Sequence, residues 1–133
     1  MAIFISKSEE DTFTFAKEYA KSLTPCDVVV LDGEMGAGKT VFVKGLAKGL
    51  GIQEEVVSPT YAYMNDYDGR LFHYDMYRIE DPADAEKLGL TDYFDMGGIC
   101  VIEWAENIAP LLPETVKRVA IKKLSESERE ISY

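Results

Sequence analysis

The chain has 133 residues, of which 47% are hydrophobic and 29% charged, and its formal net charge is -10 at pH 7. This length predicts one compact domain over residues 1–133, and the composition is that of an ordinary globular protein, which excludes a disordered chain. The acidic charge argues against direct binding of RNA or DNA, because such binding draws much of its affinity from Lys and Arg at phosphates.

The N-terminus, MAIFISKSEED, lacks the basic start of a signal peptide, and no apolar run is long enough to cross a bilayer. We therefore expect a cytoplasmic protein with no membrane partner. Cys26 and Cys100 each lie beside an apolar run, and no Cys/His cluster accompanies them. Both are expected to be buried, unreactive thiols rather than metal ligands.

The first predicted elements are a helix and a buried strand. Ser8, with Asp11 three residues later, resembles a capping box, and apolar residues then recur at helical spacing until Pro25. The β-branched run Val28–Leu31 leads directly into a glycine-rich turn, as a buried strand would.

A second helix is predicted over Lys39–Leu50, with Gly49 and Gly51 as stop signals. The rest of the chain predicts a hairpin, a short helix and three further strands. The hairpin strands are Tyr61–Tyr67 and Leu71–Tyr77, with the turn at Asp68-Gly69. The short helix runs from Asp81-Pro82 to Gly89. The further strands are Ile99–Trp104, after Gly97-Gly98, and the pair Val116–Leu124 and Glu130–Tyr133.

The segment from Gly33 to Thr40, GEMGAGKT, fits the phosphate-binding pattern GxxxxGK[ST]. Its glycines let backbone N–H groups surround a phosphate, Lys39 neutralises the β and γ phosphates, and the Thr40 hydroxyl binds Mg²⁺. A chance match in a strand-to-helix turn is the alternative, and the predicted strand before and helix after the turn favour a Mg-ATP site. The predicted nucleotide-binding residues of this loop are Glu34, Met35, Gly36, Ala37, Gly38, Lys39 and Thr40.

Hydrolysis needs a carboxylate near the metal and a group that senses the γ-phosphate. Glu103 ends the apolar run ICVIE, and Asp75 lies in the alternating segment LFHYDMYR, which puts Leu71, His73 and Asp75 on one face. Either acid is also compatible with a surface position. Thr60 is a candidate γ-phosphate sensor or a turn residue, and a hydrogen-bonded structural role is favoured for the single histidine.

Other P-loop classes lack their signatures here. The Asn-Lys-x-Asp guanine reader of GTPases does not occur. Two DxxG matches begin at Asp66 and Asp95, but one falls on the predicted hairpin turn and the other precedes an apolar strand. The few arginines are scattered, without the lid of a small-molecule kinase. A kinase and a nucleotide-gated binding module with negligible turnover stay open as alternatives.

The motifs GEMGAGKT, SPTY, FHYDMYRI and VIEWAE, in this order, resemble those of the TsaE (YjeE) family of bacterial P-loop ATPases. The resemblance runs from the first predicted helix to the last strand. It implies a three-layer α/β P-loop fold with a mixed, mainly parallel sheet and an antiparallel hairpin. It also implies a weak, Mg-dependent and partner-stimulated ATPase that supports formation of N6-threonylcarbamoyladenosine in tRNA.

In that family the ATPase works with a heterodimer of the TsaB and TsaD proteins, so tRNA would be held mainly by these partners. Carried over by motif, Thr40 and Glu103 correspond to Mg²⁺ ligands, and Asp75 to a residue needed for hydrolysis. Trp104 corresponds to an aromatic beside the nucleotide, which is ATP or ADP. Thr60 falls in a switch-like loop, and Arg129 matches a late arginine that approaches the nucleotide.

Overall fold

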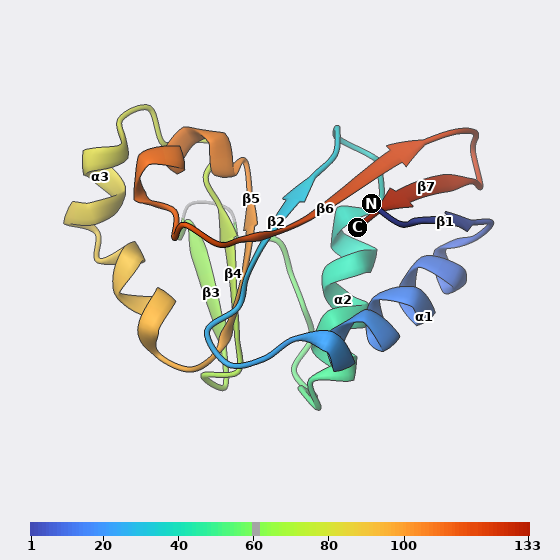
Figure 1. Cartoon of the computed structure of the whole chain (residues 1–133), viewed down its shortest axis with the longest axis horizontal. Coiled ribbons are helices and arrows are strands. Elements are labelled where there is room, and N and C mark those ends of the chain that lie inside the picture. The colour runs from blue at the N-terminus through green and yellow to red at the C-terminus, as the bar shows by residue number, and fades with distance from the viewer. Residues whose placement is uncertain (60–61) are drawn as a thin grey trace.

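The computed structural model describes residues 1–59 and 62–133, and its centre is a seven-stranded sheet in the order β1-β7-β6-β2-β5-β4-β3 (Figure 1). The strands are β1 (Ile3–Ser6), β2 (Val28–Asp32), β3 (Met64–Tyr67), β4 (Leu71–Asp75), β5 (Ile99–Glu103), β6 (Lys117–Lys123) and β7 (Arg129–Ser132). Strands β6, β2, β5 and β4 run parallel in the middle, and antiparallel pairs close both edges. The predicted mixed α/β fold is confirmed.

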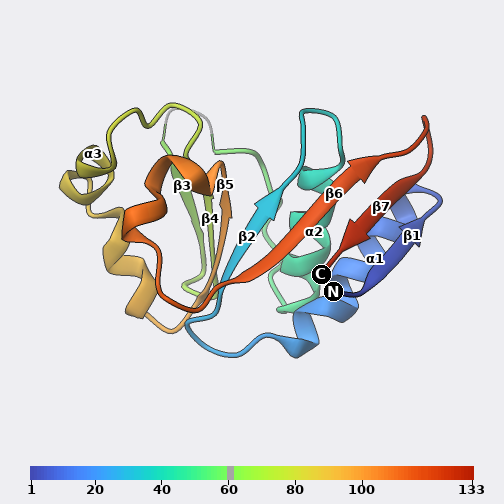
Figure 2. The ribbon, with the colours of Figure 1, turned by 45° about the horizontal axis from the view of Figure 1, so that its top comes forward.

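Helices cover both faces of this sheet and make three layers (Figures 1 and 2). On one face lie α1 (Glu9–Tyr19), the short 3-10 helix η1 (Ala20–Ser22) and α2 (Lys39–Gly49). On the other lie α3 (Pro82–Lys87) and the 3-10 helices η2 (Leu90–Asp95) and η3 (Ala105–Leu111). In the part of the chain that the structure describes, no helix has the length and apolarity needed to span a membrane.

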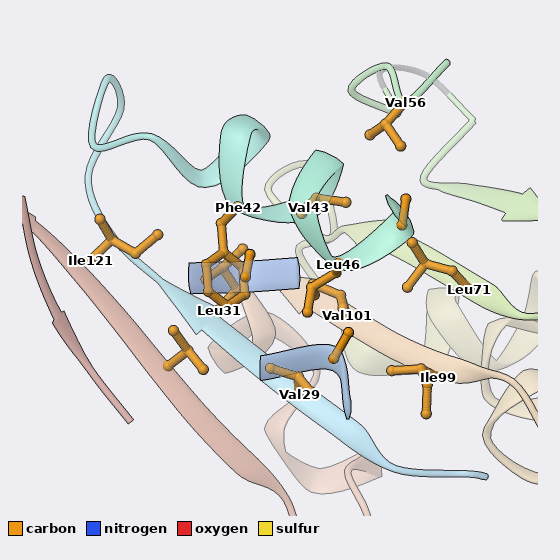
Figure 3. Packing of buried hydrophobic residues seen from close by; sticks show 14 of the residues in the cluster. Val29, Leu31, Phe42, Val43, Leu46, Val56, Leu71, Ile99, Val101 and Ile121 are labelled. Atoms are coloured by element: carbon orange, nitrogen blue, oxygen red, sulfur yellow. The ribbon is translucent and has the colours of Figure 1, made fainter. Parts of the chain in front are cut away.

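Strand β2 divides the hydrophobic core in two because successive side chains of a strand point to opposite faces. Val29 and Leu31 pack toward α1 and α2, whereas Val28 and Val30 pack toward α3, η2 and η3. Figure 3 shows the first cluster, in which Phe42 and other side chains of α2 meet those of β2 and β5. All four valine and leucine side chains are almost fully buried. This burial on both faces is why the strand reads as a continuous apolar run.

Local signals place two helix starts and the hairpin turn where they were predicted. The Ser8 Oγ accepts a hydrogen bond of 3.0 Å from the Asp11 N–H at the start of α1, and the Asp81 Oδ1 accepts one of 3.0 Å from the Ala83 N–H at the start of α3. Asp68 and Gly69 both have positive φ, 58° and 66°, as a two-residue hairpin turn between β3 and β4 requires. Short-range capping and turn chemistry therefore accounts for these ends.

Two sequence-based expectations about the fold need correction, and one strand was not predicted. Cys26 is exposed, because it lies at φ 68° in the turn before β2 rather than in the strand, while Cys100 is buried as predicted. The strand predicted over Ile99–Trp104 ends at Glu103, because Trp104 adopts a left-handed backbone with φ 58°. Strand β1 was not predicted, since four residues at a sheet edge carry little pattern and its partner β7 lies at the other end of the chain.

Gly49 is the last residue of α2, in agreement with its predicted role as a stop signal, and it also packs against α1. A Cβ on Gly49 would lie 2.5 Å from the Lys17 carbonyl oxygen, and one on Gly45 would lie 2.5 Å from the Phe13 carbonyl oxygen. Gly51, at φ 80°, supplies the left-handed residue after the helix. The two helical glycines therefore allow the backbones of α1 and α2 to approach closely, which fixes the position of α2 and of the loop that precedes it.

Substitution of Gly45 by alanine is expected to destabilise the protein by about 1–3 kcal/mol, because the new Cβ meets backbone rather than a movable side chain. This cost exceeds the gain of about 1 kcal/mol that alanine brings to a helix interior. Urea unfolding followed by circular dichroism measures the difference. The matched control is Lys44→Ala, at an exposed position of the same helix, and equal stability of the two variants would contradict the close-packing role.

Candidate functional site

Most of the predicted site residues that the structure describes meet where the parallel strands end. Strand β2 leads into the loop from Gly33, and its neighbour β5 ends at Glu103, which pairs in register with Leu31. On the other side of β5, Asp75 pairs in register with Glu103. The two carboxylates therefore lie on neighbouring strand ends beside the glycine loop, the edge at which open α/β sheets bind ligands.

The glycine loop presents an uncapped helix end. Gly36 and Gly38 have φ values of 83° and 104°, which let the chain turn before α2 begins at Lys39. The N-cap residue, Gly38, has no side chain that could cap this helix start. Because the first N–H groups of a helix have no intrahelical acceptor and carry partial positive charge, the start of α2 is suited to an anion such as phosphate.

A cavity of about 650 Å³ opens over this helix end, within the roughly 300–1,000 Å³ usual for small-molecule sites. Most of the predicted site residues line it. They are Met35, Gly36, Gly38, Lys39, Thr40, Asp75, Glu103, Trp104 and Arg129.

Among the described residues, two of those predicted for the site stand apart from this lining. Glu34 is exposed, and its carbonyl oxygen accepts a hydrogen bond of 3.1 Å from the Ala37 N–H, which closes the turn inside the loop. Ala37 is fully buried. Both therefore shape the loop rather than face the cavity. Thr60 lies outside the described residues, so its predicted role stays a prediction.

Glu103 is held by two side chains at the edge of the cavity. The Lys39 Nζ lies 3.4 Å from its Oε1, and the His73 Nε2 lies 2.6 Å from its Oε2. Burial by itself raises the pKa of Glu103, but the hydrogen bond from His73 and the attraction of Lys39 outweigh it and lower the pKa below the usual range. The carboxylate is therefore ionised at neutral pH and is protonated only well into the acid range.

The donor set fits a Mg²⁺ ion that arrives with a nucleotide. The Thr40 side chain is exposed to the cavity, and the carboxylates of Glu103 and Asp75 line the same space. Among the described residues no group of three or more His, Cys, Asp or Glu side chains could hold a metal alone. Mg²⁺ usually takes one or two carboxylates and completes its shell with phosphates and water, so a sparse protein set is what such a site needs.

Asp75 makes hydrogen bonds within the turn that follows β4 and to the segment before β3. Its Oδ1 accepts a hydrogen bond of 3.0 Å from the Tyr77 N–H, and its N–H donates one of 2.8 Å to the Tyr63 carbonyl oxygen. The bond to Tyr63 holds the end of β4 against the segment before β3. The backbone of Asp75 is thus fixed by hydrogen bonds at the point where its side chain lines the cavity.

Trp104 turns toward the lysine of the loop. Its ring centroid lies 5.6 Å from the Lys39 Nζ and 4.9 Å from the Tyr77 ring, which meets it edge on. A separation below about 6 Å allows a cation–π attraction. The left-handed backbone of this residue costs about 1–3 kcal/mol, a kind of strain that tends to be kept at functional sites.

Arg129 ties the turn between β6 and β7 to the glycine loop. Its Nε donates to the Ala37 carbonyl oxygen at 2.9 Å and its Nη2 to that of Gly36 at 3.3 Å. Its Nη1 donates to the carbonyl oxygens of Ser125 and Glu128 at 2.9 and 3.0 Å. Most of its N–H donors are thus used by backbone, and its direct approach to a nucleotide stays a prediction.

Some cavity residues were missed by sequence reasoning. They are Ser8, Glu9 and Thr12 at the start of α1, Val41, Ser58, and Glu126 and Ser127 in the β6–β7 turn. Pairing of Ser6 with Arg129 in the β1–β7 ladder brings the start of α1 beside this turn. No local pattern carries that information, apart from the capping signal at Ser8.

Comparison with known proteins identifies the family. Residues 6–131 match the family described as threonylcarbamoyl adenosine biosynthesis protein TsaE. The chain belongs to the TsaE family. This confirms the family resemblance inferred from the motifs.

Two relatives carry the name tRNA threonylcarbamoyladenosine biosynthesis protein TsaE. The one from Bacillus subtilis (strain 168) is 45% identical over 127 residues, which are 93% of this chain and 79% of the relative. The one from Treponema pallidum (strain Nichols) is 42% identical and covers 96% of each chain. The crystal structure of Bacillus subtilis YdiB is 36% identical, has a TM-score of 0.77, and covers 98% of this chain and 82% of its own.

Proposed function

We propose that this chain binds Mg-ATP and hydrolyses it as an accessory protein of tRNA threonylcarbamoyladenosine biosynthesis. Membership of the TsaE family supports the pathway. One observation carries the ATPase part of the proposal: Lys39 and Glu103 face each other, 3.4 Å apart, at the uncapped start of α2 inside one cavity. A cation, an acid and a helix N-terminus are the parts a P-loop uses for phosphoryl chemistry.

In the proposed mechanism, the N–H groups at the start of α2 bind phosphate oxygens, and Lys39 moves its ion pair from Glu103 to the β and γ phosphates. Thr40 and Glu103 would hold Mg²⁺, which when bound supplies further neutralisation of the phosphate charge. Glu103 is suited to this because its lowered pKa keeps it ionised. Asp75, on the neighbouring strand end, orients the attacking water.

The proposed partner is a heterodimer of the TsaB and TsaD type, in the cytoplasm. We propose that tRNA is held by these partners and not by the isolated chain. The net charge of -10 supports this, because a polyanion gains its affinity from basic side chains that displace counterions.

The test combines the purified chain with TsaB and TsaD proteins and with tRNA, each alone and together. We expect weak ATP hydrolysis by the chain alone, faster hydrolysis with both partners, and no gel shift of tRNA by the chain alone at physiological salt. A phosphorylated small-molecule product would instead indicate a kinase. Tight nucleotide binding without turnover under all conditions would indicate a nucleotide-gated binding module.

A further inference from the structure

His73 lies outside the cavity, yet contacts its key carboxylate. The histidine is 0% exposed, in the middle of β4, and pairs in register with Val101 of β5. It is absent from the cavity lining, whereas Glu103 is part of it. The 2.6 Å contact between His73 Nε2 and Glu103 Oε2 therefore joins a buried side chain of the sheet to a residue that lines the cavity.

The two oxygens of Glu103 have different neighbours. Oε2 is bound by His73, a rigid ring fixed in the sheet, and Oε1 faces Lys39, the residue that the proposed function moves to the phosphates. Without the histidine, the glutamate would keep rotational freedom at the moment Lys39 leaves. Hydrogen bonds to a metal-ligating carboxylate are the usual device that fixes its orientation.

We propose that His73 is a positioning residue that holds the Glu103 carboxylate ready for Mg²⁺ when a nucleotide binds. This inference rests on the proposed Mg-ATP function. It assigns His73 no contact with the nucleotide or with the metal.

The contacts of the two ring nitrogens show which of them carries the proposed role. Nδ1 is buried and has no partner among residues 1–59 and 62–133. A proton on Nε2 can be donated to the Glu103 carboxylate, whereas a proton on Nδ1 would be a buried donor without a partner among the described residues. His73 thus serves as an N–H donor at the Nε2 position. A glutamine can place an amide N–H near that position, whereas an asparagine is too short.

The experiment is calorimetric titration of the full chain with ADP, with MgCl₂ and with EDTA. Loss of a bond to a metal-ligating group typically costs about 10- to 100-fold in affinity or activity. For His73→Leu and His73→Asn we expect the affinity gain caused by Mg²⁺ to fall by about this factor, with unchanged affinity in EDTA. For His73→Gln we expect most of the gain to remain.

Tyr74→Phe is the matched control. Tyr74 lies next to His73 on β4, but its side chain is on the opposite face of the sheet. The substitution removes the buried hydrogen bond of 2.7 Å that its hydroxyl donates to the Leu90 carbonyl oxygen. It is expected to lower thermal stability without changing the Mg²⁺-dependent gain. Thermal melts of all variants show which of them fold.

The outcomes separate this inference from the proposed function. A wild-type chain whose ADP affinity does not depend on Mg²⁺ would overturn both. A normal gain in wild type with an unchanged gain in His73→Leu would overturn the positioning role alone, as would equal loss of affinity with and without Mg²⁺. If His73→Leu does not fold, the glutamine and asparagine variants decide, and equal gains in these two would overturn the role.

Discussion

Replacement of Lys39 by alanine is expected to lower the affinity for Mg-ATP by about 10- to 150-fold, which corresponds to about 1.5–3 kcal/mol for hydrogen bonds to a charged group. The variant loses the cation that neutralises phosphate. It also removes the ion pair with the Glu103 carboxylate, which then keeps its contact with His73. Thr40→Ala is expected to lose the Mg²⁺-dependent part of the affinity, because its hydroxyl is the proposed metal ligand.

Calorimetry of both variants with ATP, with and without Mg²⁺, tests this expectation. Lys44→Ala, one turn further along α2 at an exposed position, is the control for loss of a positive charge. Affinity and turnover equal to those of the wild type in both site variants would refute the P-loop function of Gly33 to Thr40.

Substitutions of Glu103 and Asp75 are expected to affect different steps, nucleotide binding and turnover. Glu103→Ala is expected to weaken Mg²⁺-dependent nucleotide binding, because Glu103 lies beside the P-loop strand and within 3.4 Å of Lys39. Asp75→Ala is expected to keep nucleotide affinity and lose about 10²- to 10⁴-fold in turnover, the range typical of a residue that handles the proton or water of the reaction. Ground-state binding and transition-state stabilisation are separable contributions.

Each variant is titrated with ATP in the presence and absence of Mg²⁺, and its turnover is measured with the partner proteins. Glu103→Gln accompanies the alanine variant because it keeps the volume and can accept the hydrogen bond from His73 while removing the charge. If Asp75→Ala loses Mg²⁺-dependent affinity while Glu103→Ala loses only turnover, the two roles are reversed.

The local parts of the site follow from the sequence because their causes lie within a few residues. The GxxxxGK[ST] pattern carries its own glycines, lysine and hydroxyl, and the β-branched apolar run before it is typical of a buried strand. The capping group at Ser8 and the Asp68-Gly69 turn act over three residues or fewer. The end of ICVIE placed Glu103 at a strand terminus without knowledge of its neighbours.

Only the tertiary structure decided what these parts contact. The bond between His73 and Glu103 joins residues 30 positions apart, and that between Arg129 and Ala37 joins residues 92 positions apart. Likewise, the sequence marks Gly49 as a helix end, but only the tertiary structure shows that it also packs against α1, where an added Cβ would lie 2.5 Å from the Lys17 carbonyl oxygen. Side-chain period and capping determine which elements form, but the pairing of distant strands determines which side chains become neighbours, and that pairing leaves no mark on any short segment.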